Sequence, residues 1–229
     1  MSKGMAIYAG RQFGERALGL ALFLLATGGQ LGLRACIWFA IYFASVISAL
    51  WLYRTSAETL ERRADIASTK DVTPTWDKVI LALFWLLGYF VIYYVAGATA
   101  DLGKPIDVLF IGGLILYSMS TALTAWALQT NAYAESVSRV QSERDQQVCS
   151  SGPYAYVRHP MYTAIIMWCV AIVAVFPTRG VALVSLAVAA LIVLRTLLED
   201  NMLAEGLPGY EQYRRTVRWR LIPKLFWRM

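Results

Sequence analysis

The sequence is poor in the residues from which most metal and redox centres are built. It contains a single histidine, His159, and three cysteines, Cys36, Cys149 and Cys169, with no CxxC or similar ligand spacing. Structural and catalytic zinc sites draw mainly on clustered Cys and His, so we expect no metal site of this kind. Two of the cysteines lie in or beside apolar segments, and we interpret all three as unpaired packing residues.

Several sequence motifs of soluble enzymes are also missing. The chain has no GxGxxG after a strand, no P-loop, no GxSxG and no HExxH. These absences argue against a Rossmann-type nucleotide site, a phosphate-binding loop and the common hydrolase and metalloprotease sites. Any small-molecule site must then be formed by other residues, and side chains at the ends of membrane helices are the candidates.

Charged residues are scarce, because they make up 16% of the 229 residues while hydrophobic residues make up 58%. A soluble domain carries about 25% charged residues. Six apolar runs account for the difference: Ala17–Leu33, Ala35–Tyr53, Val79–Ala100, Val108–Leu128, Met161–Phe176 and Val181–Leu194. A transmembrane helix needs roughly 20 apolar residues, and the last two runs reach this length only if the helix after Leu194 continues through Arg195–Leu203.

These runs predict an all-α polytopic integral membrane protein with about six transmembrane helices in three hairpins. Residues 1–130 would form two hairpins, and residues 131–229 would form a core with the last hairpin and an interfacial C-terminal helix. A transporter or other non-enzymatic membrane protein would place charges within its spans, and the assigned runs contain none except Arg34 between the first two.

The basic residues indicate the orientation in the membrane. With six spans and a cytoplasmic N-terminus, 18 of the 21 Lys and Arg lie on the cytoplasmic side, and the opposite side keeps Arg34, Lys104 and Arg179. Cytoplasmic loops of membrane proteins are enriched in Lys and Arg. We therefore expect both termini in the cytoplasm, in a bacterial inner membrane, and we interpret the net charge of +6 as a sign of topology rather than of nucleic-acid binding.

Two segments outside the apolar runs are predicted to form surface helices. The first covers Ala57–Ala67, with a break at Pro74. The second contains Tyr210, Tyr213 and Val217 on one face, with several arginines around them. This pattern favours an interfacial helix that lies against anionic lipid headgroups.

The stretch GPYAYVRHPMY, Gly152–Tyr162, leads directly into the fifth apolar run. Proline is favoured in the first helical turn, and the residue before it is pushed out of the helical conformation. His159 is therefore expected just before a helix N-terminus, beside free backbone N–H groups that suit an anion. An imidazole that only caps the helix at the membrane interface is the alternative.

Arg195 and Glu199 lie four residues apart, where the last apolar run ends. This spacing puts them on one face of a helix. A guanidinium group there could bind a carboxylate through two hydrogen bonds, and Glu199 could hold an ammonium group. The alternative is a surface ion pair between the two residues, worth at most a few tenths of a kcal/mol.

Three segments together carry a resemblance to a known family. SSGPYAYVRHPMY, RTLLEDNML and GYEQYRRTVRWRLIP, within Asn131–Pro223, resemble the isoprenylcysteine carboxyl methyltransferase family and its phospholipid methyltransferase relatives. The resemblance implies that S-adenosyl-L-methionine binds between the RHPxY helix start and the RxxxE helix, beneath a lateral opening to the lipid.

The resemblance also implies roles for individual residues. Glu199 would bind the amino-acid end of the cofactor, and Arg195 would face the methyl acceptor. The remaining cofactor-binding positions would be Gln141, Gln147, Val148, Tyr154, His159, Pro160 and Tyr162.

The predicted function is that of an S-adenosylmethionine-dependent methyltransferase that acts on a lipid or a lipidated acceptor, with carboxylate O-methylation favoured. A carboxylate acceptor needs no general base, whereas an amine or thiol must lose a proton, for which Glu199 or His159 is the candidate base. The alternatives are a phospholipid N-methyltransferase, a small-thiol methyltransferase, a membrane NADPH-dependent reductase of related architecture and a non-enzymatic membrane protein.

Overall fold

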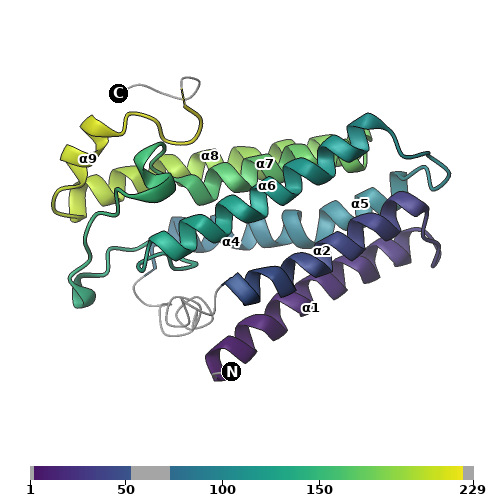
Figure 1. The fold of residues 1–229 in the computed structure, drawn as a ribbon, viewed down its shortest axis with the longest axis horizontal. Helices are drawn as coiled ribbons and strands as arrows, with labels where there is room; N and C mark the ends of the chain where they lie inside the picture. Colours follow the sequence, from purple (N-terminus) through teal and green to yellow (C-terminus); the bar gives the residue numbers. More distant parts are fainter. Residues whose placement is uncertain (1–2, 53–72, 224–229) are drawn as a thin grey trace.

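A computed structural model describes residues 3–52 and 73–223, and within these ranges it is built from helices and connecting segments, without a strand. Figure 1 shows the long helices side by side, with the turns between paired helices at one end and the C-terminal segment at the other. The elements are α1 (Lys3–Ala26), α2 (Leu33–Leu52), α4 (Thr75–Trp85), the π-helical turn η2 (Leu86–Val91), α5 (Ile92–Thr99), α6 (Val108–Thr130), the short 3₁₀ turns η3 (Ser142–Arg144) and η4 (Gly152–Ala155), α7 (Pro160–Val175), α8 (Arg179–Gly206) and α9 (Tyr210–Thr216).

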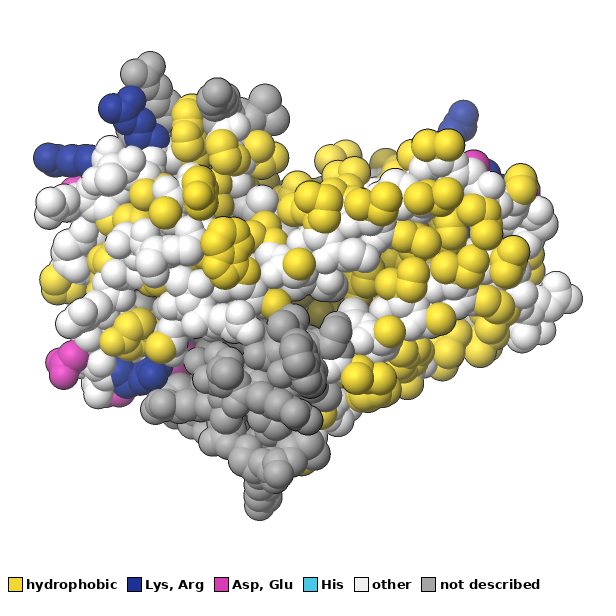
Figure 2. Space-filling view, viewed as in Figure 1, with side chains coloured by type: hydrophobic (Ala, Val, Ile, Leu, Met, Phe, Trp, Pro, Cys, Tyr) yellow, Lys and Arg dark blue, Asp and Glu magenta, His cyan; other side chains and the backbone are white. Residues whose placement is uncertain are grey.

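The predicted all-α polytopic membrane architecture is confirmed in the described residues. The packing differs from three separate hairpins, because α6 packs chiefly against α7 and α2, whereas α5 packs chiefly against α1. Three helical segments are long and apolar enough to cross a membrane, namely Thr75–Thr99, Val108–Thr130 and Arg179–Gly206, and Leu33–Ile47 and Pro160–Val175 are shorter apolar helices. Hydrophobic side chains cover much of the helical surface in Figure 2, as expected for contact with lipid.

The first helix differs from its predicted bounds. It was expected over Ala17–Leu33, but α1 begins at Lys3 and ends at Ala26. The shift has a conformational cause, since Gly28 and Gly29 adopt positive φ angles of 65° and 85° and so turn the chain away from the helix.

The same shift places charged residues on a helix that packs against the bundle. Glu15 is buried and accepts a hydrogen bond from Arg11 Nε at 2.9 Å. Arg16 donates to the Tyr42 carbonyl oxygen of α2 at 2.9 Å and lies over the Tyr42 ring. Both residues precede the apolar run Ala17–Leu33, and the contact of Arg16 with Tyr42 attaches α1 to α2.

The last long helix continues beyond its apolar run, which by itself is too short to span a membrane. α8 runs unbroken from Arg179 to Gly206, so that Arg195, Glu199 and Asp200 lie on the same helix as the apolar run. The predicted helix over Ala57–Ala67 lies outside the described residues. Pro74, its expected boundary, is the residue that precedes the first turn of α4.

The apolar face of the C-terminal helix packs on the bundle. Tyr210, Tyr213 and Val217 are buried and pack with Leu207 against the end of α8, and a position of this helix at the lipid headgroups stays a prediction. The cause of this packing is the short turn after α8, where Gly209 adopts a φ of 82° and reverses the chain. The apolar face of α9 thereby covers the end of the bundle that is described next.

Close contacts between helices hold the bundle together. Aromatic side chains from α1, α2, α5 and α6, including Phe23, Trp38, Tyr93 and Phe110, form the centre of the main core. α6 and α7 approach closely, and Ser120 Oγ of α6 donates to the Ala164 carbonyl oxygen of α7 at 2.7 Å. This packing fixes the ends of α6, α7 and α8 relative to one another.

Candidate functional site

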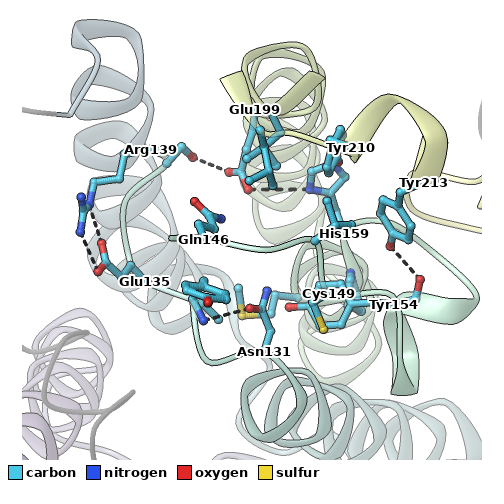
Figure 3. Close-up of a pocket in the computed structure, with 18 of the residues that line it drawn as sticks. Asn131, Glu135, Arg139, Gln146, Cys149, Tyr154, His159, Glu199, Tyr210 and Tyr213 are labelled. Carbon is cyan, nitrogen blue, oxygen red and sulfur yellow. Dashed lines mark hydrogen bonds and ion pairs between the residues drawn. The ribbon is translucent and has the colours of Figure 1, made fainter. Parts of the chain in front are cut away.

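A pocket lies at the end of the bundle where α6 stops, α7 starts and α8 is covered by α9 (Figure 3). Its empty volume is about 740 Å³, and part of it is open to solvent. The loop between α6 and α7 forms one wall, and the side chains of α8 and α9 form the other. The lining includes Asn131, Tyr133, Glu135, Ser138, Arg139, Gln146, Gln147, Val148, Cys149, Tyr154, His159, Pro160, Tyr162, Glu199, Leu203, Leu207, Tyr210 and Tyr213.

The structure brings together most of the residues that the sequence singled out. Seven of the nine predicted site residues line this one pocket, namely Gln147, Val148, Tyr154, His159, Pro160, Tyr162 and Glu199. The other two, Gln141 and Arg195, lie behind the lining.

Gln141 braces the loop instead of facing the pocket. Its side chain is 1% exposed. Nε2 donates to the Tyr133 carbonyl oxygen at 2.8 Å, and Oε1 accepts from Arg144 Nη1 at 2.7 Å. Its backbone N–H donates to Gln146 Oε1 at 2.7 Å. With both ends of its amide used in this way, Gln141 holds the wall of the pocket in shape, and a direct contact with a cofactor stays a prediction.

His159 occupies the position that the His-Pro pair predicts, immediately before α7. Its backbone N–H donates to the Arg220 carbonyl oxygen at 2.9 Å. The buried imidazole lies between two carboxylates, with Nε2 at 3.2 Å from Asp200 Oδ1 and Nδ1 at 3.9 Å from Glu199 Oε1. One face of the ring stacks on Tyr162, with centroids 5.6 Å apart. Figure 3 shows Glu199 and His159 pointing toward one another at the edge of the pocket.

Glu199 presents a positioned carboxylate to the pocket. The Tyr162 hydroxyl and the Ser138 hydroxyl both donate to its Oε2. Its side chain is 20% exposed, more than any other charged group at this junction of α7 and α8. Hydroxyl donors orient a carboxylate without neutralising its charge, so Glu199 remains able to bind a cation.

Arg195 forms a buried ion pair with a residue far away in the sequence. Its Nε donates to Asp77 Oδ1 at 2.8 Å and its Nη2 to Asp77 Oδ2 at 3.3 Å. Asp77 lies in the first turn of α4 and is fully buried. Nη2 also donates to the Ser136 carbonyl oxygen, and the guanidinium lies over the Tyr162 ring. The alternative of a surface ion pair between Arg195 and Glu199 is thus wrong, because the Arg195 guanidinium is paired with Asp77 in the interior.

Asp200 is the residue of this site that sequence reasoning missed. It is fully buried, and both of its oxygens are used. Arg158 binds it through two hydrogen bonds of 2.8 and 2.9 Å, Arg220 Nε donates at 2.8 Å, and the Tyr210 hydroxyl donates at 3.0 Å. The available signal was the arginine content of the segments SSGPYAYVRHPMY and GYEQYRRTVRWRLIP, because arginines that become buried need an anion to balance their charge.

The model of the isoprenylcysteine carboxyl methyltransferase (ICMT) family matches residues 110–205, from the first turn of α6 to the end of α8. Residues 110–205 belong to this family. No curated protein matches the chain. The match supports a membrane methyltransferase, as the three C-terminal motifs predicted.

The candidate pocket also depends on residues beyond the matched segment. Asp77 of α4 holds Arg195 from the N-terminal side, and Tyr210, Tyr213 and Arg220 close the site from the C-terminal side. Burial, followed by the charge of Asp200, raises the pKa of the Tyr210 hydroxyl well above its ordinary value. The hydroxyl therefore stays protonated and continues to donate to Asp200 across the neutral pH range.

Proposed function

We propose that the pocket binds S-adenosyl-L-methionine and that the protein transfers its methyl group to a carboxylate of a lipophilic acceptor. The observation that carries the proposal is the Glu199 carboxylate, which is oriented by two hydroxyl donors and lines the pocket between α7, α8 and the α6–α7 loop. When bound, this cofactor supplies an electrophilic methyl group on a positively charged sulfur.

The residues present fit the groups of this cofactor. Glu199 would bind the ammonium group of its methionine part, since a charge-assisted hydrogen bond to a partly buried carboxylate is strong. Val148, Leu203 and Leu207 supply apolar walls, and Tyr154 and Tyr210 supply rings, for an adenosine moiety.

Arg195 would position the acceptor. Asp77, Ser136 and Ser138 hold its Nε and Nη2, and within the part of the chain that the structure describes, Nη1 makes no hydrogen bond. A guanidinium held on one side presents its remaining N–H groups in a fixed direction. A carboxylate held there needs no base, so alignment with the methyl group and exclusion of water would supply most of the rate.

The acceptor would reach the site from the membrane. The pocket lies at the end of three apolar helices whose outer surfaces carry large exposed hydrophobic side chains. A lipid or a lipidated molecule would enter along these helices with its polar end at the pocket. The distribution of Lys and Arg supports a cytoplasmic location for this end of the bundle, with both termini on the same side, in a bacterial inner membrane.

An amine acceptor, as in a phospholipid N-methyltransferase, is the second candidate. The observation in its favour is that Nδ1 of His159 lies 3.9 Å from Glu199 and makes no closer contact with a carboxylate. The imidazole and Glu199 are thus placed to receive the proton that an amine must lose.

Binding of the cofactor is tested first. Titration calorimetry of detergent-purified protein should show saturable binding of S-adenosylhomocysteine. Glu199→Gln should weaken it about tenfold or more, the loss expected from one charge-assisted hydrogen bond. Glu205→Gln, at an exposed glutamate on the same helix, should leave it unchanged. Absence of binding by the unaltered protein, or equal losses in both variants, would contradict the proposal.

The acceptor is tested second, with a cofactor labelled in its methyl group. Membranes are incubated either with an isoprenylated cysteine carrying a free carboxylate or with phosphatidylethanolamine. Alkali releases methanol from a methyl ester and leaves N-methyl and S-methyl groups intact, so the chemistry of the product identifies the acceptor. Arg195→Lys should lower kcat on the carboxylate substrate at least tenfold, because lysine lacks the planar fork, and should change cofactor affinity little. A comparable loss of cofactor affinity would contradict the separate roles of Arg195 and Glu199.

A further inference from the structure

A second cavity lies at the opposite end of the bundle from the methyltransferase pocket. It is bounded by the α1–α2 turn, the α5–α6 loop and the α7–α8 turn, which gather at one end of the molecule in Figure 1. Its empty volume is about 670 Å³, close to that of the first pocket. No step of the proposed methyl transfer uses it.

The basic residues of this end gather at the cavity. The helix ends and turns at this end of the bundle carry three basic residues, Arg34, Lys104 and Arg179. Two of them, Arg34 and Lys104, line the cavity. Basic residues are disfavoured on the translocated side of a membrane protein. Two of them around one cavity therefore require a reason specific to that cavity.

Arg34 is a buried and rigid cation. Its residue is 5% exposed, and its Nη1 and Nη2 donate to the two oxygens of Asp107 at 3.1 and 3.3 Å. Nη2 also donates to the Ala174 carbonyl oxygen, and the guanidinium lies over the Phe110 ring. Nε is buried and has no hydrogen-bond partner within the described ranges. One N–H donor of this guanidinium is therefore not used by the described residues.

Lys104 provides the available charge. Its ammonium group forms neither a hydrogen bond nor an ion pair with any residue that the structure describes, although its side chain is half-buried in the cavity wall. Two carboxylates lie nearby. Asp107 is paired with Arg34 and also interacts electrostatically with Lys104, and Asp101, which also lines the cavity, accepts a hydrogen bond from the Gly103 N–H at 3.0 Å. The N–H groups of Lys104 are thus the cationic donors of this cavity that stay available to a ligand.

The opposite wall is apolar, with Phe23, Ala35, Val175 and Phe176 in the lining. A cavity with one cationic side and one apolar side suits a molecule with an anionic head and an apolar tail. We propose that this cavity binds a phosphate-bearing anion, and that its apolar wall selects the headgroup of an anionic phospholipid over the free ion. This site is independent of methyl transfer.

Native mass spectrometry of the detergent-purified protein tests the proposal with three probes. These are dioctanoyl phosphatidate, inorganic phosphate and uncharged dioctanoyl glycerol. Dioctanoyl phosphatidate should bind with a stoichiometry of one at low concentration, and the other two should bind at least tenfold more weakly. Equal affinity for inorganic phosphate would make the free anion the ligand and overturn the lipid assignment. Equal affinity for dioctanoyl glycerol would exclude phosphate recognition.

Three variants locate the binding site. Lys104→Gln should weaken phosphatidate binding about tenfold, as expected for loss of a charge-assisted contact. Ala100→Phe should fill the cavity without changing any charge and should abolish binding. Arg179→Gln removes an exposed cation at the same end that does not line the cavity, and it should leave binding unchanged. Unaltered binding in both Lys104→Gln and Ala100→Phe would place the lipid elsewhere and refute the proposal. Binding of S-adenosylhomocysteine, measured in parallel, reports whether each variant is folded.

Discussion

Asp200 shows how a single buried carboxylate can organise a site that it does not line. It binds Arg158, which precedes His159, and it also binds Arg220 and Tyr210 from the C-terminal segment. The start of α7, the C-terminal part of α8 and the chain after α9 are thereby joined at one residue. Glu199, one position earlier, faces the pocket. Two adjacent acidic residues therefore have separate tasks, one in support of the fold and one toward the proposed ligand.

Replacement of this anion should unfold the site. Asp200→Asn leaves two buried arginines without a counter-charge, and breaking a buried ion pair costs about 3–5 kcal/mol. We expect a clear fall in the thermal unfolding temperature in detergent and loss of S-adenosylhomocysteine binding. Asp145→Asn is the matched control, since Asp145 is exposed and its φ of 48° suits asparagine. An Asp200→Asn variant as stable as this control would show that the arginine cluster contributes nothing to stability.

At the scale of helices, hydropathy predicted the number and order of the membrane elements but neither all of their ends nor which of them pack together. The α7–α8 hairpin and the extension of α8 through Glu199 follow from the apolar runs and their lengths. The start of α1 does not, because Lys3–Arg16 is mixed in polarity and Arg16 finds one of its partners, the Tyr42 carbonyl oxygen, on α2. A partner on another helix is invisible to local periodicity.

The residues of the site were likewise predictable only where a local sequence signal marks them. The residues of the RHPxY segment and Glu199 carry local signals, a proline at a helix start and a carboxylate after an apolar run. The partner of Arg195 is Asp77, 118 positions away, and no spacing rule connects them. The burial of α9 likewise depends on the turn at Gly209 and on the end of α8 that it covers.

The contact between α6 and α7 offers a prediction at this scale. A Cβ atom on Gly113 would lie 2.9 Å from the Ala171 carbonyl oxygen and 3.0 Å from the Ala174 Cβ, whereas one on Gly112 would meet nothing within 4 Å. Gly113→Ala should therefore separate the helices and destabilise the protein by about 1–3 kcal/mol, as overpacking does. Gly112→Ala should be neutral or stabilising by up to about 1 kcal/mol, because alanine favours the helix. Thermal unfolding of the two variants in detergent measures the difference, and equal behaviour would contradict the close approach.

For the whole molecule, the two ends of the bundle differ in charge and in use. The end with the methyltransferase pocket carries the loop arginines, the Asp200 cluster and α9, and the other end carries three basic residues, two of them at the second cavity. The proposed orientation puts the first end in the cytoplasm, where a soluble cofactor is available, and the second at the outer leaflet. Both proposed ligands depend on this arrangement, because the first must come from water inside the cell and the second from lipid on the far side.

This orientation can be measured with single cysteines. The three native cysteines are replaced by serine or alanine, and Glu211→Cys on α9 or Asp101→Cys in the α5–α6 loop is introduced, both at exposed positions. A membrane-impermeant maleimide should label Asp101→Cys in spheroplasts and Glu211→Cys only in inverted vesicles, because the excess of Lys and Arg retains the α9 end in the cytoplasm. Labelling after solubilisation in detergent provides the control that both thiols are reactive. The reverse pattern would move the methyltransferase pocket outside the cell, away from cytoplasmic S-adenosylmethionine, and would make the proposed reaction untenable.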